Sequence, residues 1–281
     1  MISSPGGDGR IFVQVAAYRD PELLPTINHA LKQADRPDLL TFGICRQFHP
    51  LDRFGNLDSY KKDARFRILD WPVEKVEGVG WARRMTQRLY RGEEFTLQLD
   101  AHMRFARNWD AVMIKMLNDL RQQGYPKPLL TGYMGSYVPG GPFTPDPNDP
   151  PLQMNIHEVT PEGIPIFGSE IIPNWEKLRS PVPAKFFSGG FYFTTGGFNI
   201  EVPYDSAVYF QGEEITMAVR AFTSGYDLFH PHRMLLWHYY TRPGQQRPWN
   251  DDRQWIKKEQ RSSSAVLETL RLAGLSFQST P

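Results

Sequence analysis

Residues 95–99 alternate between large apolar side chains and Thr or Gln, and the run then stops at Asp100. A period of two residues predicts a β-strand, because successive side chains of a strand point to opposite faces. His102 follows two residues after Asp100. We therefore expect a buried strand whose carboxyl end presents a carboxylate and an imidazole.

Strand and helix patterns alternate on both sides of this strand. Such alternation predicts an α/β fold with a mostly parallel central sheet flanked by helices and joined by right-handed crossovers. Apolar runs predict further strands at residues 11–18, 39–46, 66–69 and 129–133. Apolar residues spaced three and four apart predict helices at residues 23–33, 79–90, 109–122 and 213–221.

Three stretches depart from this alternation. Residues 138–183 are rich in proline and predict a long loop insertion on the acceptor side, a lid with short strands near 155–159 and 164–167. Residues 1–10 are polar and glycine-rich, which predicts a disordered N-terminus. Residues 246–281 are polar and predict a C-terminal tail with one short helix at 265–272. The main domain is thus expected at residues 11–245. Within this domain, residues 47–62 are expected to form a loop with room for a short helix.

Charge and cysteine content exclude several kinds of partner. The 32 basic and 31 acidic residues nearly cancel, so nothing predicts binding to nucleic acid or to an anionic membrane. Cys45 is the single cysteine, which excludes an intramolecular disulfide and a cysteine zinc site. No run of 18 apolar residues occurs. These features predict a cytoplasmic protein without a membrane partner.

The pair Asp100 and His102 is the first candidate for chemistry. In an open α/β sheet, the carboxyl ends of the strands border the ligand crevice. A carboxylate with an imidazole suits a divalent cation such as Mn²⁺. The alternative is that Asp100 caps a turn and His102 is a surface residue.

The order of motifs along residues 11–242 resembles that of GT-A glycosyltransferases. More narrowly, it resembles the GlcNAc-transferase family that includes the cytosolic hydroxyproline polypeptide α-GlcNAc-transferases, and more distantly the polypeptide GalNAc-transferases. The motifs that carry the resemblance are Ala17-Tyr18-Arg19-Asp20-Pro21-Glu22-Leu23, Gly80-Trp81-Ala82-Arg83, Leu97-Gln98-Leu99-Asp100-Ala101-His102, Val202-Pro203-Tyr204-Asp205, Gly212-Glu213-Glu214-Ile215, Gly225-Tyr226-Asp227 and His238-Tyr239.

The resemblance implies a metal site. In such enzymes, an Asp-x-Asp or Asp-x-His motif binds Mn²⁺ (or Mg²⁺) at the diphosphate of a nucleotide sugar, and by resemblance Asp100 and His102 take this role. The resemblance also implies that a later histidine is the third ligand. His238 matches that place, and His230 and His232 are rivals.

The resemblance also implies contacts with the donor and the acceptor. Tyr18 and Arg19 match positions that contact the uridine, and Arg83 matches one that meets the diphosphate or the metal motif. Glu213 and Glu214 match the catalytic acidic pair that contacts the sugar or the acceptor hydroxyl. Two glycine pairs compete for the place beside the donor sugar, namely Gly189-Gly190 and Gly196-Gly197.

The function implied is a metal-dependent glycosyltransferase. It would transfer GlcNAc from UDP-GlcNAc to a hydroxyl acceptor, on a protein or peptide, with retention of configuration. Two alternatives stay open, namely a catalytically silent UDP-sugar or peptide binding module and a UDP-hexosyltransferase that acts on a small molecule or glycan. A metal-dependent phosphohydrolase is disfavoured, because one Asp-x-His motif supplies too few carboxylates for a two-metal site.

Overall fold

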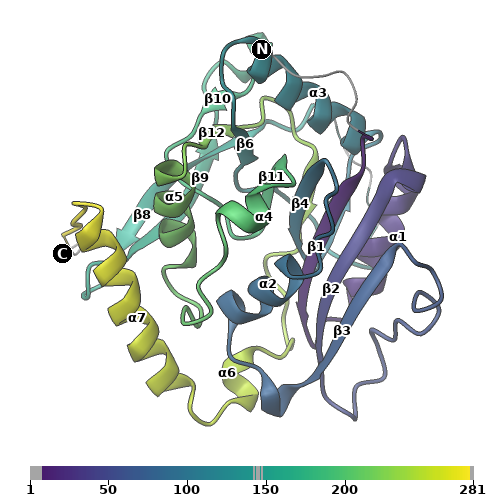
Figure 1. Cartoon of the computed structure of the whole chain (residues 1–281), viewed down its shortest axis with the longest axis vertical. Helices are drawn as coiled ribbons and strands as arrows, with labels where there is room; N and C mark the ends of the chain where they lie inside the picture. Colours follow the sequence, from purple (N-terminus) through teal and green to yellow (C-terminus); the bar gives the residue numbers. More distant parts are fainter. Residues whose placement is uncertain (1–7, 142, 144–145, 147, 279–281) are drawn as a thin grey trace.

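The computed structural model describes residues 8–141, 143, 146 and 148–278, so the predicted disordered N-terminus lies mostly outside the described residues. An eight-stranded sheet forms the centre of the molecule (Figure 1). Its strand order is β10 (Val182–Pro183), β12 (Asp227–His230), β6 (Pro128–Thr131), β11 (Phe191–Thr195), β4 (Phe95–Asp100), β1 (Ile11–Tyr18), β2 (Leu40–Phe48) and β3 (Phe66–Pro72).

Most of this sheet is parallel, as predicted. β1 pairs in parallel with β2 and β4, β2 with β3, and β6 with β12. β11 runs antiparallel between β4 and β6, and β10 is an antiparallel edge strand. The parallel half, from β4 to β3, contains the strand predicted to end at Asp100.

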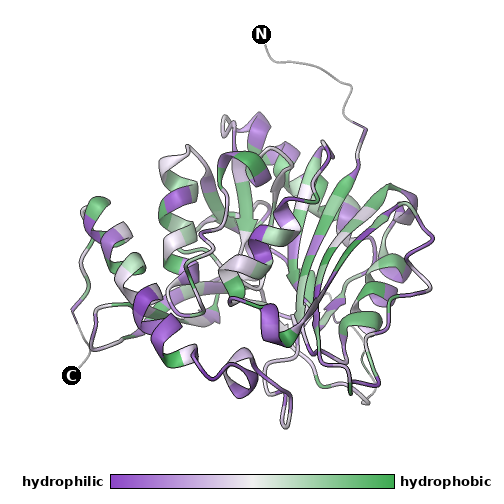
Figure 2. Cartoon of the chain, turned by 60° about the horizontal axis from the view of Figure 1, so that its bottom comes forward, coloured by the Kyte–Doolittle hydropathy of each residue, from purple (hydrophilic) through white to green (hydrophobic). Residues whose placement is uncertain are grey.

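Helices cover both faces of the sheet (Figure 1). One face packs against α1 (Leu23–Gln33) and α3 (Trp109–Gln122), whose buried residues join the largest core cluster. The other face packs against α2 (Val79–Gln87), α4 (Phe198–Glu201) and α5 (Glu213–Thr223). Figure 2 shows the strands as a mainly hydrophobic layer between amphipathic helices.

Side-chain alternation decides which residues of a strand meet which helices. Phe193 belongs to the cluster that includes α1 and α3, whereas the neighbouring Tyr192 belongs to the cluster that includes α4 and α5. In β4, Leu97 and Leu99 face α1 and α3. Gln98 and Asp100 therefore point to the α2 side, where the candidate chemistry lies.

A second, three-stranded sheet lies beside the carboxyl end of β4. Its order is β5 (Met103–Phe105), β13 (Leu236–His238) and β7 (Gly135–Ser136). None of these strands was predicted, because two or three residues are too few to show a period. The register pairs His238 with Met103, so the end of β13 lies next to His102.

The proline-rich segment is more regular than predicted. β8 (Leu152–Val159) and β9 (Pro165–Ile171) form an antiparallel hairpin with a bulge, and they extend the strands predicted at 155–159 and 164–167. Short 3-10 helices occupy Pro37–Leu39, Val73–Lys75 and Trp175–Lys177. Residues 47–62 contain turns but no helix.

The C-terminal region forms two helices, α6 (Pro248–Asp251) and α7 (Trp255–Leu272), where only a helix at 265–272 was predicted. Val266 and Leu270 of α7 are buried against Ile215 of α5 and Phe167 of the hairpin. The C-terminal helix thus covers part of the core. Within the part of the chain that the structure describes, no helix has the length and apolar character needed to cross a membrane.

Candidate functional site

A cavity of about 470 Å³ opens at the carboxyl ends of β1 and β4. The β8–β9 hairpin borders it on one side, and residues from the segment between β13 and α6 border it on the other. Its polar lining comes from seven separate parts of the chain. The polar and charged residues are Tyr18, Asp20, Gln47, Arg83, Asp100, His102, Tyr133, Gln211, Glu213, Glu214, Arg242, Gln246 and Arg247.

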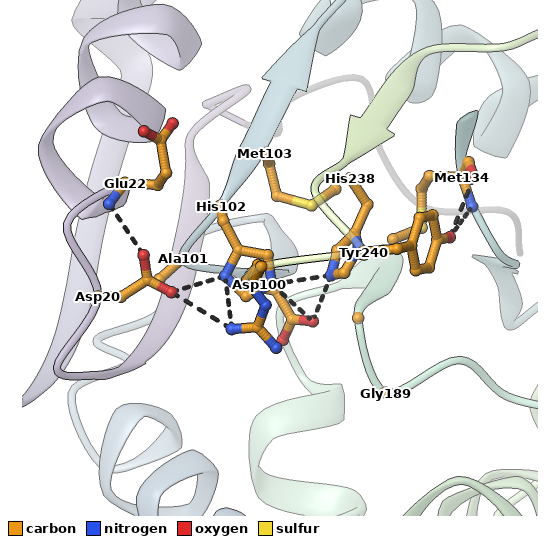
Figure 3. A network of polar contacts seen from close by, with 12 residues as sticks. Asp20, Glu22, Asp100, Ala101, His102, Met103, Met134, Gly189, His238 and Tyr240 are labelled. Carbon is orange, nitrogen blue, oxygen red and sulfur yellow. Dashed lines mark hydrogen bonds and ion pairs between the residues drawn. The ribbon is translucent and has the colours of Figure 1, made fainter. Parts of the chain in front are cut away.

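Asp100, His102 and His238 come together (Figure 3), and the first two of them line this cavity. The Nε2 atoms of His102 and His238 lie 2.9 Å apart. The Oδ2 atom of Asp100 lies 3.0 Å from Nε2 of His238 and 3.9 Å from Nε2 of His102. Both histidines are buried, whereas the Asp100 side chain is 26% exposed and faces the cavity.

The separations within this cluster fit a divalent cation. Neighbouring ligands around an octahedral ion at about 2.1 Å lie about 3 Å apart. Two of the three separations are 2.9 and 3.0 Å, and a mixture of imidazole and carboxylate ligands suits Mn²⁺. Burial lowers the pKa of His238, which favours the neutral imidazole that a metal requires.

Arg83 connects Asp100 to α5. Its Nη2 donates to Oδ1 of Asp100 at 3.0 Å, and its Nη1 pairs with Oε1 of Glu213. Burial acts to raise the pKa of Asp100, but the hydrogen bond from His238 and the charge of Arg83 outweigh it and hold that pKa below its ordinary value. Burial raises the pKa of Glu213 even though Arg83 opposes this. The lowered pKa of Asp100 keeps this carboxyl group ionised, and an ionised carboxylate is a suitable ligand for a divalent cation.

The helix that carries Arg83 is held close by a glycine. A Cβ atom at Gly80 would lie 2.2 Å from the carbonyl oxygen of Asp205, so α2 could not approach the 202–205 segment with any larger residue. Tyr204 of that segment accepts from Arg83 at 3.4 Å and from Gln98 at 2.8 Å. Two of the sequence motifs thus pack directly on one another.

Gly189 and Gly190 lie at the cluster, and Gly197 does not. A Cβ atom at Gly189 would lie 2.8 Å from Nη1 of Arg83, and one at Gly190 would lie 3.2 Å from Oδ2 of Asp100. β11 runs antiparallel to β4, with Thr195 opposite Phe95, so Gly197 lies at the far end of the sheet from Asp100. Of the two competing glycine pairs, the geometry brings only Gly189-Gly190 to the cavity.

Glu214 occupies the wall of the cavity beside Gly189. It accepts a hydrogen bond from the Tyr133 hydroxyl at 2.8 Å and another from the Gly189 backbone N–H at 2.8 Å. Burial raises the pKa of Glu214 to about 7 against these two donors. Glu214 is therefore a carboxyl group that can exchange a proton near neutral pH.

Tyr18 and Arg19 differ in their position relative to the cavity. Tyr18 lines the cavity, and its hydroxyl donates to Asp251 at 2.6 Å. Arg19 is absent from the cavity lining and forms ion pairs with Asp52 at 2.7 Å and with Asp251 at 3.0 Å. Both contacts with Asp251 join the end of β1 to α6.

The rival histidines lie elsewhere. Nδ1 of His230 lies 2.9 Å from the Thr131 carbonyl oxygen, and its Nε2 accepts from the Met154 backbone N–H at 3.3 Å. His232 does not belong to the group formed by Asp100, His102 and His238 either. Among the described residues, His238 is the histidine that joins Asp100 and His102.

Three residues of the site were not assigned a role from the sequence. Oδ2 of Asp20 lies 2.7 Å from Nδ1 of His102 (Figure 3). Nη1 of Arg242 lies 3.3 Å from the same nitrogen. The ring of Tyr240 lies 4.2 Å from that of His238. Asp20 lies just after β1, and Asp100 is the last residue of β4. Adjacent parallel strands end at the same edge of a sheet, so the sequence positions of Asp20 and Asp100 could have indicated that they lie close together.

The fold is that of GT-A glycosyltransferases. The crystal structure of GalNAc-T7 with UDP, GalNAc and Mn²⁺ is similar, with a TM-score of 0.68 and 16% identity over 93% of this chain and 48% of that chain. The structure of Staphylococcus aureus TarS 1-349 in complex with UDP-GlcNAc has a TM-score of 0.52 and 12% identity, covering 94% of this chain and 65% of that one.

The chain belongs to the Glycosyltransferase (GlcNAc) family, whose model matches residues 10–64 and 53–279. The chain spans about half of the GalNAc-T7 chain and just under two thirds of the TarS chain. A search of curated protein sequences found no match.

Proposed function

We propose that this chain transfers GlcNAc from UDP-GlcNAc to a hydroxyl group of a protein or peptide, with retention of the α configuration. The observation that carries the proposal is the convergence of Asp100, His102 and His238 in one group, two of whose members, Asp100 and His102, line the cavity. Membership of the GlcNAc family supports the donor sugar. Two similar structures, that of TarS in complex with UDP-GlcNAc and that of GalNAc-T7 with UDP, GalNAc and Mn²⁺, support the nucleotide and the ion.

Asp100, His102 and His238 are the residues that would hold Mn²⁺ or Mg²⁺. A divalent cation at this place supplies positive charge that offsets the charge developing on a departing nucleotide diphosphate. Arg83 keeps Asp100 ionised, since it donates to Oδ1 and leaves Oδ2 directed at the two imidazoles. Tyr18 borders the cavity on the side of β1, where we place the uridine.

Gly189 and Gly190 line the cavity next to the cluster, and their lack of side chains lets a sugar approach the backbone. Glu213 and Glu214, at the start of α5, line the same cavity. Glu213 is paired with Arg83, so its charge is already balanced. Burial raises the pKa of both carboxyl groups, but Glu214 has no ion pair with any described residue, so we assign it to the hydrogen bond with the sugar or with the acceptor hydroxyl.

The experiment is a transfer assay with UDP-GlcNAc, Mn²⁺ and hydroxyl-bearing peptides. Mass spectrometry should show the addition of one N-acetylhexosamine, released UDP should match it, and proton NMR of the product should show an α-linked sugar. UDP-GalNAc and UDP-glucose serve as donor controls. Calorimetry with UDP runs beside the assay, because binding without turnover identifies a silent binding module. Absence of both binding and turnover would overturn the proposal.

A further inference from the structure

The two histidines of the cluster have different surroundings. Nδ1 of His102 lies 2.7 Å from Oδ2 of Asp20, and both side chains are nearly inaccessible, at 5% and 3% exposed. Nδ1 of His238 is buried and has no hydrogen-bond partner among the described residues. On the Nδ1 side of the ring, away from the other two residues of the cluster, only His102 therefore has a carboxylate that can hold the ring proton.

From this geometry we propose that Asp20 is a positioning residue that keeps the His102 proton on Nδ1 and so leaves Nε2 free to bind a metal. The inference rests on the proposed metal site. A carboxylate accepts hydrogen bonds and donates none when ionised, so the ring nitrogen that faces it must carry the proton. A histidine that binds a metal through one nitrogen commonly donates from the other, and the outer partner fixes the orientation of the ring.

Arg242 competes for the same nitrogen. Its Nη1 lies 3.3 Å from Nδ1 of His102 and 3.5 Å from Oδ2 of Asp20. If Arg242 donated to Nδ1, the proton of His102 would move to Nε2 and block that ligand. The contact from Asp20 is shorter by 0.6 Å. Arg242 instead pairs with the carboxylate, which leaves Asp20 in control of the ring.

Asp20 itself is held by the backbone. Its other oxygen, Oδ1, accepts from the Glu22 N–H at 2.9 Å, immediately before α1 (Figure 3). A backbone N–H group can only donate a hydrogen bond, so the atom of residue 20 that faces it must be an acceptor. In Asp20→Asn, the single amide oxygen is therefore expected to remain on the Glu22 N–H, so that the NH₂ group faces Nδ1 of His102. The substitution keeps the shape of the side chain and reverses the polarity at His102.

The test compares Asp20→Asn with Asp110→Asn. Asp110 is also a buried carboxylate with two contacts, since it accepts from the backbone N–H groups of Asp35 and Arg36, and it lies outside the cavity lining. Long-range ¹H–¹⁵N spectra of the metal-free protein at pH 8 report the tautomer, with His102 assigned from the spectrum of His102→Ala. Calorimetry with Mn²⁺ alone reports the affinity.

We expect Nδ1–H in the wild type and in Asp110→Asn, and Nε2–H in Asp20→Asn. The Mn²⁺ affinity of Asp20→Asn should fall by about 10- to 100-fold, with no change in Asp110→Asn. Wild-type affinity or an unchanged tautomer in Asp20→Asn would overturn the inference. If Asp20→Asn does not fold, an Nε2–H tautomer in the wild type overturns it equally. Failure of the wild type to bind Mn²⁺ would instead overturn the metal site, while the spectra still test Asp20.

Discussion

The Nε2 atoms of His102 and His238 lie 2.9 Å apart, although 136 positions of the sequence separate these residues. The pairing of β5 with β13 brings them together, because His238 is in register with Met103. At this distance one proton between the two nitrogens makes an ordinary N–H···N hydrogen bond, whereas a proton on each of them would bring two N–H groups against one another. Burial lowers the pKa of His238, so the cluster favours a divalent cation over a second proton.

Replacement of Asp100 by Ala is expected to remove metal-dependent UDP binding while the fold survives. The substitution deletes one of the three proposed metal ligands and the only carboxylate among them. The apparent affinity for UDP in the presence of Mn²⁺ should fall by more than about a hundredfold, which exceeds the usual effect of losing an outer-shell partner. Calorimetry with and without Mn²⁺ measures this, and Asp58→Ala, an exposed aspartate, is the control. Unchanged binding would show that the metal assignment is wrong.

Arg83→Leu tests the buried ion pairs that Arg83 forms with Asp100 and Glu213. Arg83 is 7% exposed and lies between the carboxylates of Asp100 and Glu213. Without the guanidinium, two neighbouring carboxylates lose their counter-charge, and breaking a buried pair in this way costs about 3–5 kcal/mol. The free energy of unfolding in urea should fall by that amount, with little change in Arg88→Leu, an exposed residue at the end of the same helix. A loss below about 1 kcal/mol would contradict the role given to Arg83.

Two chemical routes could give the proposed retention of configuration, and they make different demands on Glu213 and Glu214. A double displacement needs a carboxylate that attacks the anomeric carbon, whereas front-face departure needs mainly electrostatic stabilisation of the leaving group. The partners of both glutamates, Arg83 for one and Tyr133 with Gly189 for the other, favour the second route. We expect the double variant with Gln at both positions to keep measurable transfer. Trapping of a glycosylated Glu213 or Glu214 by mass spectrometry would contradict this.

Stability should decrease from pH 4.5 to pH 7 because of Glu214. Burial raises its pKa from the ordinary value of 4.5 to about 7 in the folded protein. The folded state therefore binds more protons than the unfolded state in this window, so the contribution is fully present below pH 4.5 and is lost as the pH rises through 7. The loss amounts to about 3 kcal/mol, since each tenfold change in proton affinity corresponds to about 1.4 kcal/mol.

Urea unfolding at pH 4.5, 6 and 7.5 measures this loss. Glu214→Gln should remove most of the difference, because glutamine has no proton to release. Glu162→Gln, an exposed glutamate in the turn between β8 and β9, should leave the wild-type profile unchanged. Parallel profiles for the wild type and Glu214→Gln would show that Glu214 titrates at an ordinary pKa.

Local patterns in the sequence were sufficient for the parallel half of the sheet. The alternation at residues 95–99 predicted β4, and the helix predicted at residues 109–122 coincides with α3. Asp100 at the end of β4 was also predicted, because a strand that stops at a polar residue is visible in the sequence alone. These features depend on neighbours a few residues apart.

Features that depend on distant pairing were not visible. The small sheet that places His238 has strands of two or three residues, and only its register with β5 brings His238 to His102. Asp20 was part of a quoted motif but had no role, because its contact with His102 appears only when β1 and β4 lie side by side. Gly197 was considered beside Gly189 and Gly190, since the sequence does not show that β11 runs antiparallel to β4.

The C-terminal helix illustrates a further limit and gives the last prediction. α7 begins ten residues earlier than the helix expected at residue 265. The sequence did not predict the first half of α7, because this half buries only Ser262. A helix that buries so little has no apolar period to detect. Its second half buries Val266 and Leu270 against α5 and the β8–β9 hairpin, so the segment should stabilise the whole domain.

Leu270→Ala should therefore lower the free energy of unfolding by about 2–5 kcal/mol, the usual cost of emptying a buried leucine site. Leu270 is 2% exposed, whereas Leu272 in the same helix is 72% exposed. Leu272→Ala is the matched control and should change stability by less than about 0.5 kcal/mol. Because α7 packs on α5, which carries Glu213 and Glu214, Leu270→Ala should also weaken UDP binding near its unfolding midpoint. Equal stability of the two variants would mean that residues 246–281 are a tail that the domain does not need.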